Sequence, residues 1–219
     1  MPSDLQIYRA VMRNDLQAFL EGAFPVVDGR WALEIAPYLE YLVCELTGIS
    51  ESRESRLIIN LPPRHLKSVL TSIVFVAWLL GRNPKLRIAV ISHSQALALD
   101  LASKTFQLVG SDFYRKVFPG FRLRDNGRKV MDFVTEDGGG RYAASFETGV
   151  TGRGFDIIII DDPISAHHTK SEKERTKINE SFKNMISSRL DDPINGAMIV
   201  VGQRMHEDDL SGNLLQKGG

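Results

Sequence analysis

Cysteine is almost absent from this sequence. Cys44 is the one cysteine among 219 residues, so no disulfide can form within the chain, and this usage suits a reducing compartment. Cys44 lies in an apolar segment with helical periodicity, and small apolar thiols usually pack inside proteins. We therefore expect Cys44 to be a buried packing residue.

The sequence also lacks an excess of charge of either sign. It has 27 basic and 27 acidic residues, for a formal net charge of zero. This balance argues against a nonspecific polycation, although a local basic stripe could still bind nucleic acid. With 43% apolar and 25% charged residues, the chain reads as globular rather than disordered, and its length allows one large domain with a full core.

No hydrophobic run is long enough to span a bilayer. The most apolar stretch, residues 69–80, is too short and contains Thr71 and Ser72. The first residues, MPSDLQIYRAV, do not have the basic-then-apolar order of an export signal. We therefore expect no membrane partner.

Glycine is missing from the one stretch around which the chain is organised, RLIINLPPRHLKS, residues 56–68. An apolar run predicts a short buried strand, and two adjacent prolines then force a turn. Lys67 and Ser68 open an apolar helix. This order is typical of a phosphate-binding loop, GxxxxGK[ST], but Leu61 and Leu66 stand where the two glycines belong.

We predict that this turn binds a nucleotide. Its backbone N–H groups and the helix end would hold the phosphates, Lys67 would reach the β and γ phosphates, and the Ser68 hydroxyl would hold Mg²⁺. The alternative is a solvated, proline-rich turn in which Lys67 and Ser68 are ordinary first-turn residues. The predicted nucleotide-binding residues are Pro63, Arg64, His65, Leu66, Lys67, Ser68 and Val69.

A second motif, FDIIIIDD, covers residues 155–162. Four consecutive isoleucines predict a parallel strand that is buried on both faces. Asp161 would join Ser68 in the Mg²⁺ shell, and Asp162 would orient or deprotonate the attacking water, because phosphoryl transfer depends on positioning and charge neutralisation. The alternative is a capping or turn pair before Pro163.

Three further side chains are candidates for the same chemistry. Gln203 follows another apolar strand, residues 197–202, and would sense the γ phosphate, unless it is merely a polar strand-end residue. Arg64 lies inside the phosphate loop. Arg153, in the glycine-rich loop GVTGRG, could act as an arginine finger on the nucleotide of a neighbouring subunit. Alternatively, Arg153 is a solvated loop residue that holds a carboxylate.

Strands alternate with helices along the chain. Apolar strands are expected at 57–59, 87–92, 155–162 and 197–202, with a hairpin formed by 129–134 and 141–146 and a long polar helix at 170–190. This alternation predicts an α/β fold with a mainly parallel central sheet flanked by helices, and ligands bind such sheets at the carboxyl ends of the strands.

The N-terminal part is expected to be helical. Residues 4–21 and 33–46 have helical periodicity and flank a predicted loop at 24–31. Trp31 or Tyr38 could contact an adenine, although packing in the core is the stronger expectation for both. A final helix is expected at 206–215.

Together these motifs resemble one family. PPRHLKS, TGRGFDIIIIDDP and VVGQRMHEDDLSG, in this order and spacing, look like the ATPase domain of the large terminase subunit of tailed bacteriophages and prophages. That branch carries PPRH-x-KS in place of the glycine-rich loop and Asp where relatives have Glu, as at Asp162. The resemblance implies a P-loop NTPase fold (ASCE/RecA-like), with ATP and Mg²⁺ as cofactors.

The resemblance also implies a motor that packages double-stranded DNA into a procapsid in the cytoplasm of a bacterial host. Such motors work as rings, pentamers when assembled, on the portal protein and with a small terminase subunit. In this reading residues 1–219 are a single P-loop ATPase domain, of which residues 1–55 form a helical segment packed on the core. The nuclease domain that such proteins carry after the motor is not expected here, and neither is DNA cleavage.

Two other functions remain open from the residues alone. One is a nucleotide-binding but inactive prophage remnant or assembly subunit. The other is a helicase-like DNA translocase, which the length of the chain disfavours because helicase motifs need a second core domain.

Overall fold

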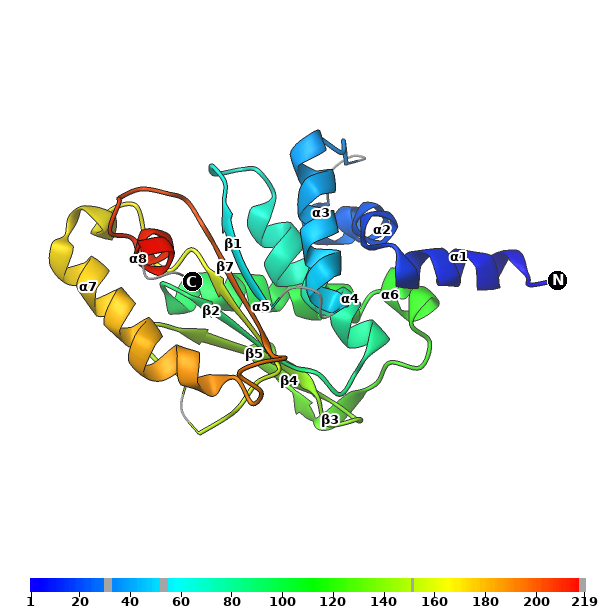
Figure 1. Cartoon of the computed structure of the whole chain (residues 1–219). Helices are drawn as coiled ribbons and strands as arrows, with labels where there is room; N and C mark the ends of the chain where they lie inside the picture. Colours follow the sequence, from blue (N-terminus) through cyan, green and yellow to red (C-terminus); the bar gives the residue numbers. More distant parts are fainter. Residues whose placement is uncertain (30–32, 52–54, 151, 217–219) are drawn as a thin grey trace.

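A seven-stranded sheet forms the centre of the protein, in the strand order β1-β7-β6-β2-β5-β4-β3. The structure is a computed structural model that describes residues 1–29, 33–51, 55–150 and 152–216 (Figure 1). The strands β1, β7, β6, β2 and β5 run parallel, and β4 and β3 continue the sheet antiparallel at one edge. The strand bounds are β1 (Arg56–Asn60), β2 (Arg87–Ser92), β3 (Leu123–Arg128), β4 (Asp132–Thr135), β5 (Gly140–Ser145), β6 (Ile157–Asp161) and β7 (Ala197–Gly202).

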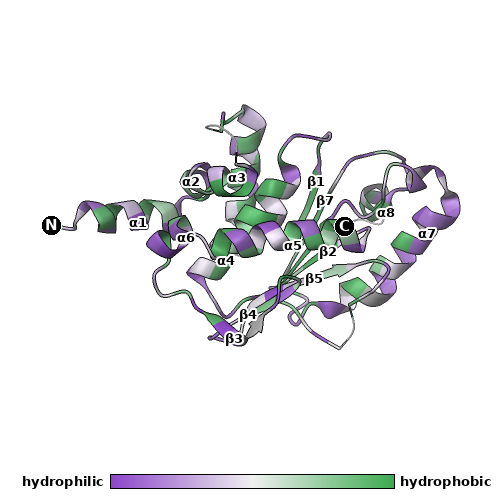
Figure 2. Cartoon of the chain, turned by 180° about the vertical axis from the view of Figure 1, so that it is seen from behind, coloured by the Kyte–Doolittle hydropathy of each residue, from purple (hydrophilic) through white to green (hydrophobic). Residues whose placement is uncertain are grey.

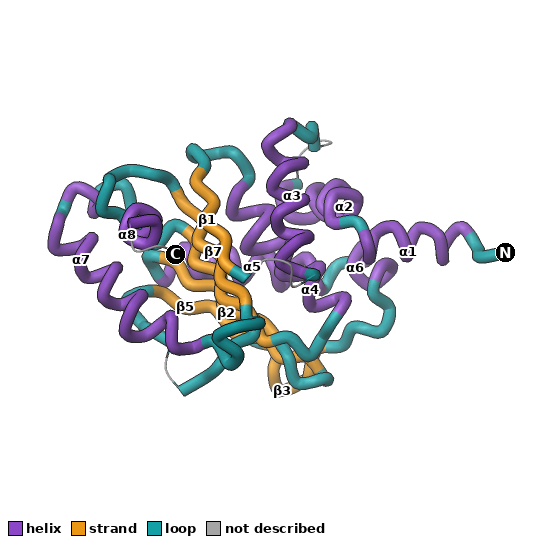
Figure 3. The backbone as a smooth tube through the Cα atoms, in the orientation of Figure 1, coloured by secondary structure: helices purple, strands orange, loops and turns teal. Residues whose placement is uncertain are grey.

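Helices cover both faces of this sheet (Figures 1 and 3). One face carries most of the helices that precede β3, and the other carries the last two helices of the chain. The first group is α1 (Asp4–Asn14), α2 (Leu16–Asp28), α3 (Pro37–Ser50), α4 (Phe75–Arg82), α5 (Gln95–Val109) and α6 (Asp112–Val117), and the second is α7 (Glu172–Ser181) and α8 (Leu210–Gln216). The predicted α/β architecture is therefore confirmed.

The isoleucine run of β6 explains how one strand joins the two layers. Ile157 and Ile159 belong to the hydrophobic cluster under α2–α5, whereas Ile158 and Ile160 belong to the cluster under α7 and α8. Because both faces of the strand are covered, every position must be apolar, which is why the sequence shows a continuous run rather than alternation.

The most apolar segment of the sequence crosses the core as a helix. It begins as a π-helical stretch at Val69–Val74 and continues as α4, which is largely hydrophobic in Figure 2. The indole Nε1 of buried Trp78 donates to the backbone carbonyl of Met12, 3.1 Å away. Among the described residues, no helix has the length and apolar character needed to cross a membrane.

The N-terminal region differs from its prediction. Instead of one helix over 4–21, the chain breaks at Asp15, whose carboxylate caps α2 by accepting from the N–H groups of Gln17 and Ala18. The helix α2 then continues through Pro25 to Asp28, so most of the loop expected at 24–31 is helical, and it ends at Gly29 with a left-handed φ of 61°. Residues 30–32, including Trp31, lie outside the described residues.

Several other helix boundaries differ from those predicted. The second N-terminal helix, expected at 33–46, starts at Pro37, which fits the first turn of a helix, and ends at Ser50. The helix expected at 170–190 divides into α7, a π-helical stretch at Phe182–Ile186 and a 3-10 turn at Ser187–Arg189. The last helix begins at Leu210 rather than at residue 206, and the strand β3 was not anticipated.

The register of the sheet aligns the ends of its parallel strands. Asn60 at the end of β1 lies opposite Gly202 of β7, and Asp161 at the end of β6 lies opposite Val201 of β7 and Ser92 of β2. The residues that follow these strands therefore emerge along one edge, where parallel sheets bind ligands.

The expectation for Cys44 was wrong. Its segment does form α3, but Cys44 lies on the exposed side of that helix, because helical periodicity turns the apolar face of α3 toward the core at Leu42 and Leu46 instead.

We predict that Cys44 in the native protein reacts with a thiol reagent such as 5,5′-dithiobis(2-nitrobenzoic acid) at close to the rate of the unfolded chain. The reason is that reaction requires only access to the thiolate. Native and guanidinium-unfolded samples would be followed by absorbance. A native thiol that reacts only after unfolding would contradict this placement.

Candidate functional site: a nucleotide-binding edge of the sheet

The loop after β1 adopts the backbone of a glycine-rich turn without its glycines. Arg64 and Leu66 have left-handed φ values of 62° and 56°, a conformation that costs an ordinary L-residue roughly 1–2 kcal/mol. Leu61, the other position where glycine was missing, is not among the residues with a positive φ. Its N–H donates to the carbonyl of Gly202 at 3.0 Å, which fixes the start of the loop against β7.

His65 ties the middle of the loop to itself and to α3. Its Nδ1 lies 2.8 Å from the backbone carbonyl of Pro63, and its ring centroid is 5.5 Å from that of Tyr38. These contacts stabilise the tight turn between the two left-handed residues.

Two side-chain contacts join the loop to the acid pair after the isoleucine strand. The Nζ of Lys67 lies 3.4 Å from Oδ2 of Asp162. The hydroxyl of Ser68 donates to Oδ1 of Asp161 at 2.9 Å. Residues that are almost 100 positions apart in the sequence thus meet, and the contact between Ser68 and Asp161 is the pairing that the phosphate-loop interpretation predicts.

Asp161 is fully buried, and its carboxylate accepts hydrogen bonds from two serine hydroxyls. Besides Ser68, the hydroxyl of Ser72 donates to Oδ2 at 2.5 Å. Burial raises the pKa of Asp161 from 3.8 to about 6. The charge of Asp162 also raises this pKa, whereas the two serine hydrogen bonds and the charge of Lys67 lower it.

Arg141 is a buried cation on β5 that the sequence did not single out. It has no exposed surface, and none of its three guanidinium nitrogens has a hydrogen-bond partner among the described residues. Burial lowers its pKa to about 9, while the negative charge of Asp161 raises it.

Asp162 adopts a strained backbone at the end of the strand, with a left-handed φ of 45°. Its N–H donates to the carbonyl of Val201 at 2.8 Å. Its own carbonyl accepts from the N–H of His93 at 3.2 Å, and Nδ1 of the same histidine lies 2.9 Å away. Sequence reasoning missed His93, although its place directly after β2 matches the place of Asp162 directly after β6.

A cavity of about 830 Å³ opens beside the phosphate loop, a volume suited to a nucleotide-sized ligand. Tyr38, for which an adenine contact was the weaker of two expectations, lines it. The wall comprises Phe24, Val27, Asp28, Tyr38, Arg64, Leu66, Lys67, Ser68, Val69 and Lys104. Of the predicted nucleotide-binding residues, Pro63 and His65 are not in this wall.

Gln203 and Arg153 occupy different positions relative to this edge. Gln203 comes directly after β7, the strand between β1 and β6, and is half-buried. Arg153 instead lies on the β4–β5 side of the sheet, where its Nη1 is 2.6 Å from Oδ2 of Asp132 and its guanidinium stacks 4.7 Å above the Tyr142 ring. Within one chain, Arg153 thus holds a carboxylate, as the alternative interpretation had it.

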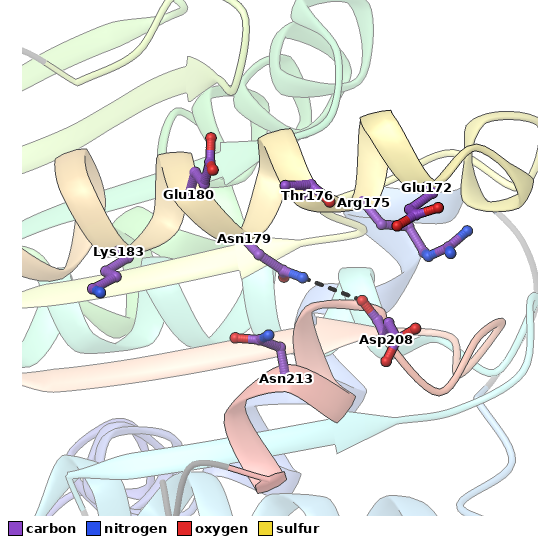
Figure 4. Close-up of a pocket in the computed structure, with 8 residues that line it drawn as sticks. All are labelled: Glu172, Arg175, Thr176, Asn179, Glu180, Lys183, Asp208 and Asn213. Carbon is purple, nitrogen blue, oxygen red and sulfur yellow. Dashed lines mark hydrogen bonds between the residues drawn. The ribbon is translucent and has the colours of Figure 1, made fainter.

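A second, smaller cavity of about 400 Å³ lies between α7 and α8. Its lining side chains are polar or charged, and the amide of Asn179 donates to the carbonyl of Asp208 across it at 3.2 Å (Figure 4). None of the predicted site residues lines this cavity.

The residues at the edge of the sheet suit a magnesium–nucleotide complex. Mg²⁺ is commonly held by one or two protein oxygen ligands together with substrate phosphates, and Ser68 and Asp161 supply a hydroxyl and a carboxylate within hydrogen-bond distance of each other. Lys67 adds a nearly buried positive charge at the same place. The donor set therefore fits the cofactor that the sequence implied.

We predict that Leu66→Ile destabilises the protein by about 1–3 kcal/mol, because a β-branched side chain fits a left-handed backbone poorly. Leu66→Met, which keeps a flexible side chain of similar volume, is the matched control and should cost less. Chemical denaturation measures both. Equal losses for the two variants would contradict a left-handed backbone at Leu66.

We also predict a pH-dependent stability that Asp161→Asn removes. Between pH 3.8 and about 6 the folded protein holds a proton at Asp161 that the unfolded chain has lost, so stability falls as the pH rises through this window and stays lower above it. At neutral pH the variant should be more stable than the parent by up to about 3 kcal/mol.

Urea denaturation across pH tests this prediction, with Asp112→Asn, an almost fully exposed carboxyl, as the control. A parent and an Asp161→Asn variant with the same pH dependence would contradict the raised pKa.

Comparison with known proteins bears on the fold of this chain. Searches against protein-family models and against curated proteins find no match. Among solved structures, the chain is similar to the large terminase of bacteriophage HK97, with a TM-score of 0.61 and 14% identity over 94% of this chain and 41% of that chain. It therefore spans less than half of that protein.

A second solved structure, a LAO/AO transport system kinase, has 14% identity over 99% of this chain and 75% of that chain, but its TM-score of 0.21 is too low to carry an argument. The resemblance is thus confirmed at the level of the fold: this chain has an α/β fold with a mainly parallel central sheet, in the arrangement found in the large terminase of bacteriophage HK97.

Proposed function

We propose that this chain is the ATP-hydrolysing motor domain of a viral terminase, which drives double-stranded DNA into a procapsid. The observation that carries the proposal is the meeting of Lys67 with Asp162 and of Ser68 with Asp161 at the carboxyl edge of the sheet. A structural turn would not need a buried carboxylate, a nearly buried lysine and a nucleotide-sized cavity at one place.

Each residue has a distinct role in this proposal. The loop residues Pro63 to Val69 would bind the phosphates, and Ser68 and Asp161 would hold Mg²⁺, which would supply positive charge against the phosphates. Asp162 positions and deprotonates the attacking water, and Arg64 neutralises phosphate charge. Gln203, on the strand between the loop and the acids, couples the γ phosphate to motion.

Lys67 has a further consequence in the free protein. Its ammonium group lies 3.4 Å from the carboxylate of Asp162, so the two charges neutralise each other until a phosphate competes for the lysine. Nucleotide binding would then release Asp162 to act on water, which links phosphate recognition to the catalytic carboxylate.

The assembly follows from the same proposal. The chain would form a ring, a pentamer when assembled, on a portal protein, with a small terminase subunit and duplex DNA as partners, in the cytoplasm of the bacterial host. Arg153 would then leave Asp132 and reach the nucleotide of a neighbour. Its position on the β5–β4 half of the sheet, away from β1, suits an arginine that serves another subunit.

The decisive test is Mg²⁺-dependent ATP turnover at rising protein concentration, with and without linear duplex DNA. We expect turnover that rises more than linearly with concentration and is stimulated by duplex. Asp162→Asn should abolish turnover with ATP binding retained, because the carboxylate acts on water rather than on the phosphates. Lys67→Ala should weaken binding itself.

The other outcomes are equally informative. ATP binding without turnover under any condition would favour a nucleotide-binding assembly subunit over a motor. Failure to bind ATP at all would contradict the phosphate-loop assignment. Turnover that Asp162→Asn leaves unchanged would show that another group activates the water.

The cavity predicts a contact to the base. Tyr38→Ala should weaken ATP binding by about 1 kcal/mol, roughly fivefold, the lower end of what aromatic stacking on a base contributes. Tyr41→Ala is the matched control, because Tyr41 lies on the same helix but points to solvent. Titration with a fluorescent ATP analogue measures both, and equal affinities would place the base elsewhere.

A further inference from the structure

We propose that His93 is a positioning residue for Asp162: it holds the backbone of the catalytic carboxylate in its left-handed conformation. The inference rests on the proposed ATPase function and extends it to a residue outside the phosphate loop and the acid pair. Its basis is a double contact, in which both the N–H and Nδ1 of His93 approach the carbonyl oxygen of Asp162, at 3.2 and 2.9 Å.

The double contact indicates which ring nitrogen of His93 carries a hydrogen. A carbonyl oxygen can only accept, so Nδ1 must carry a proton and donate it. The backbone N–H and the ring N–H of one residue therefore grip a single oxygen, and the ring cannot rotate without losing the second hydrogen bond. His93 is half-buried, which protects this hydrogen bond from full competition by water.

His93 is itself held in place at both ends. The residue before it, Ser92, ends β2 and lies opposite Asp161 in the sheet. The residue after it, Ser94, caps α5 by accepting from the N–H of Leu97 at 3.3 Å. The imidazole thus sits on a short, rigid link between a buried strand and a helix, which is what a positioning residue needs.

The backbone that His93 grips is strained and is over-determined by its neighbours. Asp162 has a φ of 45°, a conformation that non-glycine residues keep only when surrounding contacts impose it. The carbonyl of Val201 on β7 holds its N–H, and His93 beyond β2 holds its C=O. Two neighbours of β6 thus clamp the residue from both sides.

This conformation decides where the carboxylate points. With Asp162 clamped, its Oδ2 lies 3.4 Å from Nζ of Lys67, at the mouth of the phosphate loop. Without the second hydrogen bond from His93, the residue could relax toward the extended conformation of a strand end, which would rotate the carboxylate away from the loop. The loss would fall on the chemical step rather than on nucleotide binding.

The test uses three variants of the whole chain. His93→Leu removes the ring donor and keeps the backbone N–H. His93→Asn places an amide N–H near the position of Nδ1 and should rescue the contact. His167→Leu, which changes an exposed histidine on the segment after β6, is the matched control. We expect His93→Leu to lower kcat about 10- to 100-fold, the scale of a misplaced catalytic group, with ATP affinity unchanged.

His93→Asn should recover most of that loss, and His167→Leu should match the parent. Crystal structures of the parent and of His93→Leu provide a readout that does not depend on turnover: the φ of Asp162 should leave the left-handed region only in the variant. A parental kcat and an unchanged φ in His93→Leu would overturn the proposal, and so would a loss that His93→Asn does not rescue.

The two proposals fail in different ways. If the parent hydrolyses ATP and His93→Leu does so equally well, the motor stands and the positioning role falls. If the parent hydrolyses no ATP while the φ of Asp162 moves in His93→Leu, the backbone clamp stands and the proposed ATPase function falls.

Discussion

The buried carboxylate of Asp161 is the constraint on which the site depends. An ion without access to water is costly unless hydrogen bonds and opposite charges compensate it. Here the compensation comes from Ser68 and Ser72, both on the helical segment that follows the phosphate loop. The same hydrogen bonds that make burial tolerable therefore dock that segment onto β6, and this docking brings Lys67 to within 3.4 Å of Asp162. The contacts that bury this carboxylate are therefore also the contacts that assemble the site.

The strained backbone conformations lie around this docking point and not in the body of the fold. The non-glycine residues with positive φ are, among the described residues, Arg64, Leu66 and Asp162, and all three belong to the loop or the acid pair. Such a cluster is typical of functional sites, where surrounding contacts maintain a conformation that the local sequence disfavours. The neighbouring strands supply these contacts: β7 holds the start of the loop and the N–H of Asp162, and His93 after β2 holds the carbonyl. Hydrogen bonds from the parallel sheet thus hold the loop in its conformation although it lacks the usual glycines.

The sequence could predict those features that local pattern encodes. A strand of uninterrupted isoleucines is stable only when both of its faces are covered. The four isoleucines of β6 therefore predicted a strand with a hydrophobic layer on each side. The strand–turn–Lys–Ser order and the two acids after a buried strand singled out two segments whose side chains are in contact in the structure. Local pattern failed where a tertiary contact outweighed it. Asp15 looked like a helix-interior residue but caps α2, and Cys44 lies in an apolar segment but on its exposed side.

By itself, then, the sequence determined the α/β class and which segments are candidates for the site, because periodicity, turn chemistry and strand-end acids are encoded within a few residues. Only the tertiary structure decided which side chains meet. His93 and Arg141 gained their relation to the acid pair solely through the strand order that sets β2 beside β6 and β5 beside β2. The ion pair between Arg153 and Asp132, at the antiparallel edge of the sheet, depends on strand order in the same way. The physical reason is that hydrogen bonds and charges act over a few ångströms in space, and strand order, which local pattern leaves open, determines which residues come that close.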